Sequence, residues 1–289
     1  MPTRRKLLIA GGAAAGLTAL AAGLVEARVL PGRATVHEFL GLTGEDGVVP
    51  DIEPGERLTG SFVSAAIPGT ETAWAVALPP GRPADGLPVA VYLHGRGADH
   101  RHAETVGLGH FLAAAVGAGV PPFALAAVDG GADGFWHPRA SGDPERMIVE
   151  EFLPRLSTLG LSTARIGLLG HSMGGFGALS VAGRHRDTVA AAVAVSPAIW
   201  RGFDEAQPGA FDDVADFDRH DLFTRRPELA GLPLRVDCGN DDPFAPNVAD
   251  YLDGLPDCEG GMTPGLHTDG FLRRVAPAGL AFLGERLAR

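Results

Sequence analysis

A serine set between glycines is the group in this sequence with the clearest capacity for chemistry. The stretch Gly170–Gly177 reads GHSMGGFG, with Ser172 two residues from a glycine on either side. An apolar run at 165–169 precedes it and small residues follow it, which predicts a strand, a sharp turn and a helix. Such a turn holds a nucleophilic serine in a strained conformation at a helix N-terminus, where negative charge is favoured. We predict that Ser172 is a nucleophile; the alternative is a glycine-rich turn that only packs a strand against a helix.

A serine hydroxyl needs a base to take its proton, and in hydrolases with this turn an acid and then a histidine follow the serine. Of the ten histidines, only His267 lies after the acidic stretch DCGNDDPF. His267 is therefore the predicted base, and His220, which precedes the acids, is the alternative. The acid that orients the imidazole is Asp237, Asp241 or Asp242, and spacing alone does not choose among them.

Acyl transfer also requires donors for the oxyanion that forms on the substrate carbonyl. One expected donor is the backbone N–H of Met173, directly after the nucleophile. The other is expected from the turn Gly95-Arg96-Gly97, which follows an apolar strand at 88–93. These donors belong to the backbone, so side-chain identity does not reveal them.

The elements that must position these residues form a regular alternation. Apolar runs without polar alternation are separated by stretches with helical spacing, which predicts an α/β fold with a mostly parallel central sheet and helices on both faces. In such sheets, ligands bind outside the carboxyl ends of the strands, where the serine, the acids and the 95–97 turn would all lie. The predicted parallel strands are 88–93, 123–128, 164–169, 189–195 and 233–238, with a hairpin at 61–67 and 72–78 and helices at 104–117, 144–159, 173–184, 244–255 and 270–287.

Four sequence blocks together resemble the putative-esterase family of α/β-hydrolases, which includes S-formylglutathione hydrolases and mycobacterial mycolyltransferases. The blocks occur in the family's order over roughly residues 60–289, and they are LHGR at 93–96, GHSMGGFGAL at 170–179, GNDDPF at 239–244 and GLH at 265–267. The elbow GHSMGG is more similar to the esterases than to the mycolyltransferases.

The resemblance implies specific roles for residues of this chain. It implies the α/β-hydrolase fold, Asp242 as the triad acid, and the backbone N–H groups of Arg96 and Met173 as oxyanion donors. The predicted reaction requires no metal or organic cofactor. Relatives often have leucine at the position of Arg96, and we expect its side chain to point into solvent rather than to close the mouth of the site.

Other residues could line a substrate pocket or bind a metal. Asp129, Phe135 and Trp136 follow a strand end and are expected either to line the pocket or to cover the core. The stretch DHRH at 99–102, together with His94, contains metal-binding residue types, but its spacing is that of a solvated loop rather than of a structural zinc site. The depth of the pocket depends on residues 129–143 and 196–231.

The N-terminus has a composition of its own. Basic residues at 4–6 precede an apolar run at 7–25, a pattern that resembles a twin-arginine export signal. An ordinary secretory signal or an uncleaved membrane anchor are the alternatives. We predict an export signal or anchor at 1–27, a lead-in at 28–60, and a catalytic domain at 61–289 with an irregular insert at 196–231. The protein would then meet the export machinery and be extracellular or attached to the cell envelope.

Charge and cysteine content limit the partners further. The net charge of −11 argues against nucleic acid as a partner, because a strongly acidic surface repels phosphates. Cys238 and Cys258 could pair in an oxidising environment or remain two small buried residues. The sequence thus predicts an exported serine esterase acting on a small-molecule or lipid ester. An acyltransferase to a sugar or lipid hydroxyl and an inactive cell-envelope binding protein are the alternatives.

Overall fold

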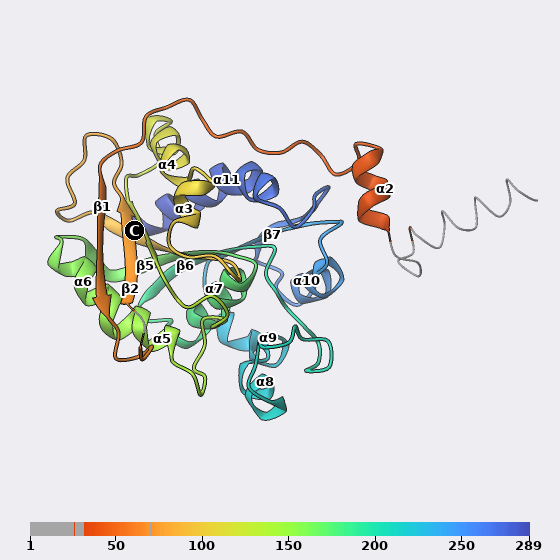
Figure 1. Ribbon diagram of the computed structural model, residues 1–289. Helices are drawn as coiled ribbons and strands as arrows, with labels where there is room; N and C mark the ends of the chain where they lie inside the picture. Colours follow the sequence, from red (N-terminus) through yellow and green to blue (C-terminus); the bar gives the residue numbers. More distant parts are fainter. Residues whose placement is uncertain (1–25, 27–31, 70) are drawn as a thin grey trace, which may run out of the picture. The chain divides into compact units, whose positions relative to one another are not determined.

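The computed structural model describes residues 26, 32–69 and 71–289 (Figure 1). The predicted export signal at 1–27 therefore lies outside the described residues, except for Glu26. The chain divides into two compact units, residues 1–44 and residues 45–289. The first contains the short helix α2 (Arg33–Phe39). Among the described residues, none of the helices has the length and hydropathy needed to span a bilayer.

In the described part of the second unit, eight strands form one sheet in the order β1-β2-β4-β3-β5-β6-β7-β8. The hairpin β1–β2 and the pair β2–β4 are antiparallel, and all other neighbours are parallel. The strands are β1 (Arg57–Val63), β2 (Glu71–Ala77), β3 (Pro88–Leu93), β4 (Ala124–Val128), β5 (Ser162–His171), β6 (Val189–Val195), β7 (Leu234–Gly239) and β8 (Glu259–Thr263).

Helices cover both faces of this sheet, as predicted (Figure 1). One face packs against α3 (His102–Thr105), α4 (Leu108–Gly117) and α11 (Asp269–Leu287). The other packs against α7 (Met173–Arg184) and its neighbours. The strands between the layers are apolar on both sides, and all of β6 is buried. The remaining helices are α5 (Pro144–Arg146), the π-helical turn Met147–Phe152, α6 (Leu153–Thr158), α8 (Val214–His220), α9 (Leu222–Arg225), the 3-10 turn Arg226–Leu229 and α10 (Ala245–Leu252).

Four predicted elements differ from the observed ones. The first strand of the hairpin is Arg57–Val63 instead of 61–67. The helix expected at 104–117 is divided into α3 and α4, and Gly107 between them has a left-handed backbone (φ 80°). The helix expected at 144–159 contains a π-helical turn just before Pro154, because proline has no N–H to donate to the preceding turn. The insert at 196–231 was expected to be irregular, but it contains α8 and α9. Asp213 and Asp221 start these helices, since their carboxylates accept hydrogen bonds from backbone amides of the first turn.

The edge strand β8 was not predicted, because its sequence EGGMT has little β propensity. It forms through backbone pairing with β7, in a register that places Arg235 opposite Glu259. The same register places Cys258 near the start of β7, about 13 Å along the strand from Cys238. The two cysteines are free thiols, since a disulfide needs Cα atoms within about 7 Å of each other. Burial raises the pKa of both, that of Cys258 to about 11.

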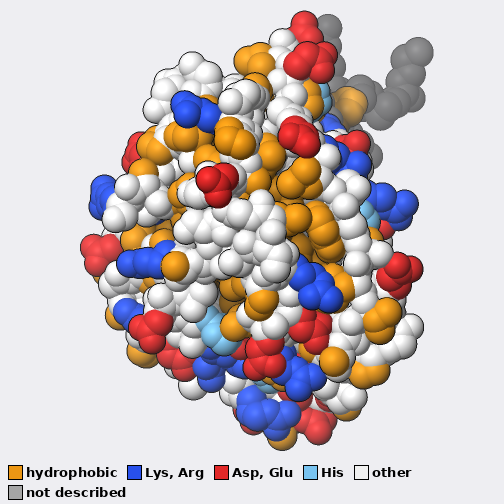
Figure 2. Space-filling view, turned by 90° about the vertical axis from the view of Figure 1, so that its left-hand side faces the viewer, with side chains coloured by type: hydrophobic (Ala, Val, Ile, Leu, Met, Phe, Trp, Pro, Cys, Tyr) orange, Lys and Arg blue, Asp and Glu red, His pale blue; other side chains and the backbone are white. Residues whose placement is uncertain are grey.

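The surface on the β1 side of the sheet carries acidic and basic side chains in mixture (Figure 2). Hydrophobic atoms are visible between them, and the basic side chains on this face are scattered among acidic ones rather than gathered into a continuous patch.

Helix α7 approaches the sheet so closely that its first turn requires glycine. A Cβ atom on Gly174 would lie 1.8 Å from the carbonyl oxygen of Leu93 in β3, and one on Gly177 would lie 2.4 Å from Cβ of Trp136. The glycines of GHSMGGFG therefore allow backbone to pack against backbone and against a buried indole.

We expect Gly174→Ala to destabilise the protein by about 1–3 kcal/mol or more, because the added methyl meets a backbone atom that cannot rotate away. Urea unfolding of the purified variant measures the loss. Gly117→Ala, at the end of α4, is the matched control, since nothing lies within 4 Å of a Cβ there. Equal stability of the two variants would contradict the packing role of Gly174.

Candidate active site

Ser172 is the single residue between β5 and α7, and its backbone is strained. Its φ of 57° and ψ of −115° lie in a region that residues with a side chain rarely adopt. Its amide donates to the carbonyl oxygen of Val195 (2.9 Å), and its own carbonyl accepts from the amides of Phe176 and Ala198 (3.1 Å each). These bonds hold the strained conformation in place, so the serine side chain projects from a fixed turn.

Three side chains from distant segments meet at this turn. The Nε2 atom of His267 lies 2.8 Å from Oγ of Ser172, and its Nδ1 atom lies 2.7 Å from Oδ2 of Asp242. A carboxylate only accepts hydrogen bonds, so Nδ1 carries the proton and Nε2 presents its lone pair to the serine hydroxyl. The arrangement can therefore remove a proton from Ser172.

The structure distinguishes among the three candidate acids. The Asp242 side chain is completely buried, and its second oxygen accepts from the amide of Phe244 (2.8 Å). The Asp237 carboxylate is held instead by the guanidinium of Arg235, at 2.7 and 2.8 Å. Of the three carboxylates, that of Asp242 is the one bonded to His267.

The turn at 95–97 lies against Ser172. A Cβ atom on Gly95 would be 3.5 Å from Cβ of Ser172, so the backbone that leads directly into Arg96 passes close to the serine. Met173 is the first residue of α7, and the amide of a first helical residue has no acceptor within its own helix. Both predicted oxyanion donors thus belong to segments that border the serine.

The Arg96 side chain does not point freely into solvent as expected. Its guanidinium binds both carboxylate oxygens of Asp133 (2.6 and 3.1 Å) and the carbonyl oxygen of Pro208 (3.0 Å). Asp133 belongs to the loop after β4 and Pro208 to the insert, so one side chain connects the 95–97 turn to both. The ion pair is half exposed and contributes about 1 kcal/mol or less.

A stack of imidazole rings lies behind His267. The buried ring of His171 stacks on His267 (centroids 5.2 Å apart) and, beyond it, on His102 (6.0 Å). His102 is held by the hydroxyl of Tyr92 (2.6 Å) and by Asp269 (3.0 Å). Burial holds the pKa of His171 well below its ordinary value, so this ring stays neutral and supports His267 without adding charge.

The residues behind His267 and His171 were not predicted from the sequence. His102, Tyr92 and Asp269 come from three separate elements, and no motif joins them. One feature of the sequence could have indicated them: Asp269 lies two residues after the predicted base His267, at the start of the last helix.

The three residues proposed for a substrate pocket have other contacts. Phe135 and Trp136 are completely buried, so they cover the core and do not line an open pocket in this structure. Trp136 donates from its indole nitrogen to the carbonyl oxygen of His94 (3.1 Å). The Asp129 carboxylate accepts from the amide and the ring of His100 (2.7 Å each), which anchors the 99–102 loop.

We expect the protein to lose stability as the pH falls below about 6.5. Burial lowers the pKa of His94 and of His171 from the ordinary value of 6.5. Below that value the unfolded chain binds protons that the folded chain does not, whereas above it neither state does. Each of these histidines then lowers the free energy of unfolding by up to about 1.4 kcal/mol for each unit by which the pH falls. Urea unfolding at several pH values between 8 and 5 measures how the free energy of unfolding changes with pH. His171→Gln should reduce this dependence by the contribution of one histidine, about 1.4 kcal/mol per pH unit at most. A stability that stays constant or rises towards pH 5 would contradict the neutral burial of these rings.

Comparison with known proteins places this site in a family. The family described as putative esterase matches residues 64–250, about two thirds of the chain. The matched segment includes Ser172 and Asp242, and His267 lies beyond its end. No curated protein sequence matches the chain.

Several solved structures share the fold. A ferulic acid esterase superimposes with a TM-score of 0.70 at 20% identity, over 82% of this chain and 99% of that one. The S-formylglutathione hydrolase from Agrobacterium tumefaciens superimposes with a TM-score of 0.67 at 18% identity, over 84% of this chain and 100% of that one. The fluorophosphonate-binding serine hydrolase FphF from Staphylococcus aureus superimposes with a TM-score of 0.66 at 18% identity, over 80% of this chain and 99% of that one. With the eight-stranded sheet and the family match, the chain belongs to the putative-esterase family of α/β-hydrolases and is an ester-hydrolysing enzyme.

Proposed function

We propose that this enzyme hydrolyses carboxylic esters through a triad of Ser172, His267 and Asp242, with an acyl-enzyme intermediate. The observation that carries the proposal is the unbroken hydrogen-bonded path from the Ser172 hydroxyl through both nitrogens of His267 to the buried Asp242. The order of these residues along the chain is also that of α/β-hydrolases.

In the first half of the reaction, Oγ of Ser172 attacks the ester carbonyl carbon while Nε2 of His267 takes the hydroxyl proton. The carbonyl oxygen becomes an oxyanion, which the N–H groups of Arg96 and Met173 stabilise; the latter lies at the positive end of α7. His267 then donates its proton to the leaving alkoxide oxygen. The C–O bond of the substrate breaks, and the alcohol departs from the acyl-enzyme.

In the second half, water replaces the alcohol. His267 takes a proton from the water as its oxygen attacks the acyl carbon, and the proton returns to Oγ of Ser172 as the acid is released. Asp242 holds the imidazole in one tautomer and stabilises its protonated form in both halves. The His267 side chain is 25% exposed, so water can approach it.

We expect Ser172→Ala and His267→Ala each to lower kcat for p-nitrophenyl acetate by about 10⁴- to 10⁶-fold, because each removes a reacting group. A fluorophosphonate probe should label the wild type and not Ser172→Ala. Activity close to wild type in either variant would contradict the mechanism. An unlabelled, folded wild-type protein would favour the inactive binding protein instead.

Asp242→Asn and Asp241→Asn form a matched pair of neighbouring substitutions that tests the choice of acid. Asp242→Asn should cost about 10⁴-fold in kcat, because an amide can donate to Nδ1 and favour the wrong tautomer. Asp241→Asn should retain most of the activity. A larger loss in Asp241→Asn would overturn the assignment of Asp242.

Transfer of the acyl group to a sugar or lipid hydroxyl would use the same three residues, so the products must be measured. With an acceptor alcohol present at millimolar concentration, we expect the free acid to remain the main product of ester turnover. Accumulation of the acceptor's ester in place of the acid would identify an acyltransferase.

We also propose that the protein is exported by the twin-arginine route through residues 1–27. The basic residues at 4–6 and the apolar run at 7–25 support this. The substrate proposed is a small-molecule or lipid ester, which would reach the enzyme outside the cytoplasm or at the cell envelope.

A further inference from the structure

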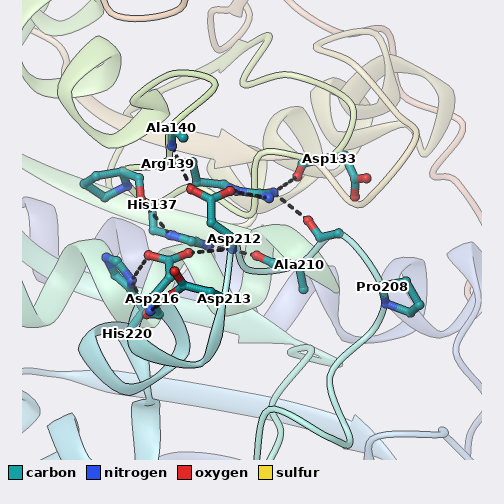
Figure 3. A network of polar contacts seen from close by, with 12 residues as sticks. Asp133, His137, Arg139, Ala140, Pro208, Ala210, Asp212, Asp213, Asp216 and His220 are labelled. Atoms are coloured by element: carbon teal, nitrogen blue, oxygen red, sulfur yellow. Dashed lines mark hydrogen bonds and ion pairs between the residues drawn. The ribbon is translucent and has the colours of Figure 1, made fainter.

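A second group of buried titratable side chains lies outside the triad. His137 belongs to the loop after β4, whereas Asp216 and His220 belong to α8 of the insert (Figure 3). All three are nearly inaccessible to solvent, with exposed fractions of 0%, 1% and 3%. One nitrogen of each imidazole and one oxygen of the carboxylate all lie within 4.8 Å of one another. Two imidazoles and a carboxylate are thus gathered around one point in the interior.

The contacts of His137 cannot all be satisfied by a neutral ring. Its Nδ1 atom lies 3.1 Å from the carbonyl oxygen of Pro138. Its Nε2 atom lies 3.0 Å from the carbonyl oxygen of Ala210 (Figure 3). Neutral imidazole has only one N–H, so its other nitrogen directs a lone pair at a carbonyl oxygen.

A bound metal ion would remove this conflict. Two ligand atoms about 2.1 Å from the same ion lie about 3.0 to 3.4 Å apart. The separation of 3.0 Å between a ring nitrogen of His137 and the carbonyl oxygen of Ala210 falls at the short end of that range. The ion would attract the lone pairs that otherwise repel each other.

His220 offers a further nitrogen and a route to the interior. Its Nδ1 atom lies 2.8 Å from the backbone oxygen and 3.1 Å from Oδ1 of Asp216. Within the part of the chain that the structure describes, its Nε2 atom makes no hydrogen bond. His220 and Asp216 border a cavity of about 720 Å³, through which an ion can enter.

The surrounding contacts hold Asp216 in place. Its Oδ2 atom accepts from the amide of Asp212 (2.9 Å), and its own amide donates to Asp213 (2.7 Å). Arg219 reaches Oδ1 at 3.1 Å, but its side chain is 63% exposed and can leave. Arg139 is neutralised by Asp212 at 2.9 Å, so it does not oppose a cation.

We propose that His137, Asp216 and His220 bind a divalent transition-metal ion of the zinc type, with the carbonyl oxygen of Ala210 as a fourth ligand. Two imidazoles and one carboxylate suit zinc, whereas calcium and magnesium prefer sites made only of oxygen. The ion would cross-link the loop after β4 to α8. Its role is structural, because it stabilises the insert and touches no triad residue.

Two other groups of possible ligands fit a metal less well. In the group of His102, His171 and Asp269, both nitrogens of His102 are already hydrogen-bonded. In the group of Asp99, His100 and Asp129, the carboxylate of Asp99 is bound by Arg101.

The test uses the purified chain without an affinity tag. Calorimetric titration with zinc chloride and metal analysis after dialysis should give one zinc per chain, and Tm should rise by about 5 °C at zinc concentrations near 100 times Kd. His137→Gln and His220→Gln should each weaken zinc binding by about 100-fold or more, since loss of even an outer contact costs 10- to 100-fold. Arg219→Gln is the control on the same helix. It keeps all the proposed ligands and removes a cation that competes for Asp216, so it should bind zinc at least as tightly as the wild type.

Zinc binding that persists unchanged in both histidine variants would overturn the proposal and place the ion elsewhere. Failure of the wild type to bind zinc would also overturn the proposal. If the variants do not fold, X-ray absorption of the zinc-loaded wild type still decides. Two imidazole ligands with oxygen support the site, and a thiolate ligand or a single imidazole contradicts it.

Discussion

The structure depends on the strained backbone of Ser172, which must be held where a strand turns sharply into a helix. A φ of 57° costs free energy that the surrounding contacts have to supply. The end of β6, the segment that follows it and the first turn of α7 supply it through three backbone hydrogen bonds. The first turn of α7 can approach only because glycine stands at 170 and 174, where any Cβ would lie within 2 Å of a carbonyl oxygen. The same close approach brings the first amide of α7 and the 95–97 turn beside the serine.

Burial sets the charge of the side chains around this turn. Asp242 is inaccessible to solvent, yet one carboxylate oxygen is bound by His267 and the other by a backbone amide, so both are satisfied. His171 is equally enclosed but has no hydrogen-bond partner for Nε2 among the described residues, and it remains neutral. In the proposed mechanism an imidazolium forms on His267, and a protonated His171 would repel it. A neutral ring at that position therefore supports the base without opposing its protonation.

Arginines connect the loops that border the site. Arg96 joins the 95–97 turn to Asp133 and to the insert. Arg139 donates to the backbone oxygen of Asp133 in its own loop and to the carboxylate of Asp212 in the insert (Figure 3). The proposed metal site at His137 would add a third connection between the same two segments. The loop after β4 and the insert thus form a linked structure, which Arg96 joins to the turn beside Ser172.

The sequence by itself determined the α/β fold, the elbow at Ser172 and the position of the histidine, because apolar runs, glycine spacing and chain order are local properties. It narrowed the acid to three aspartates, and only the resemblance to a family favoured Asp242. The edge strand β8 escaped prediction because backbone pairing to β7, and not its residues, makes it a strand. The sequence also left open whether Phe135 and Trp136 line the pocket or cover the core. An aromatic residue in a loop can do either, and the segments that pack over it decide which. The tertiary structure alone decided the imidazole stack, the contacts of Arg96 and the cluster at His137, because each joins residues far apart in the chain whose proximity depends on packing.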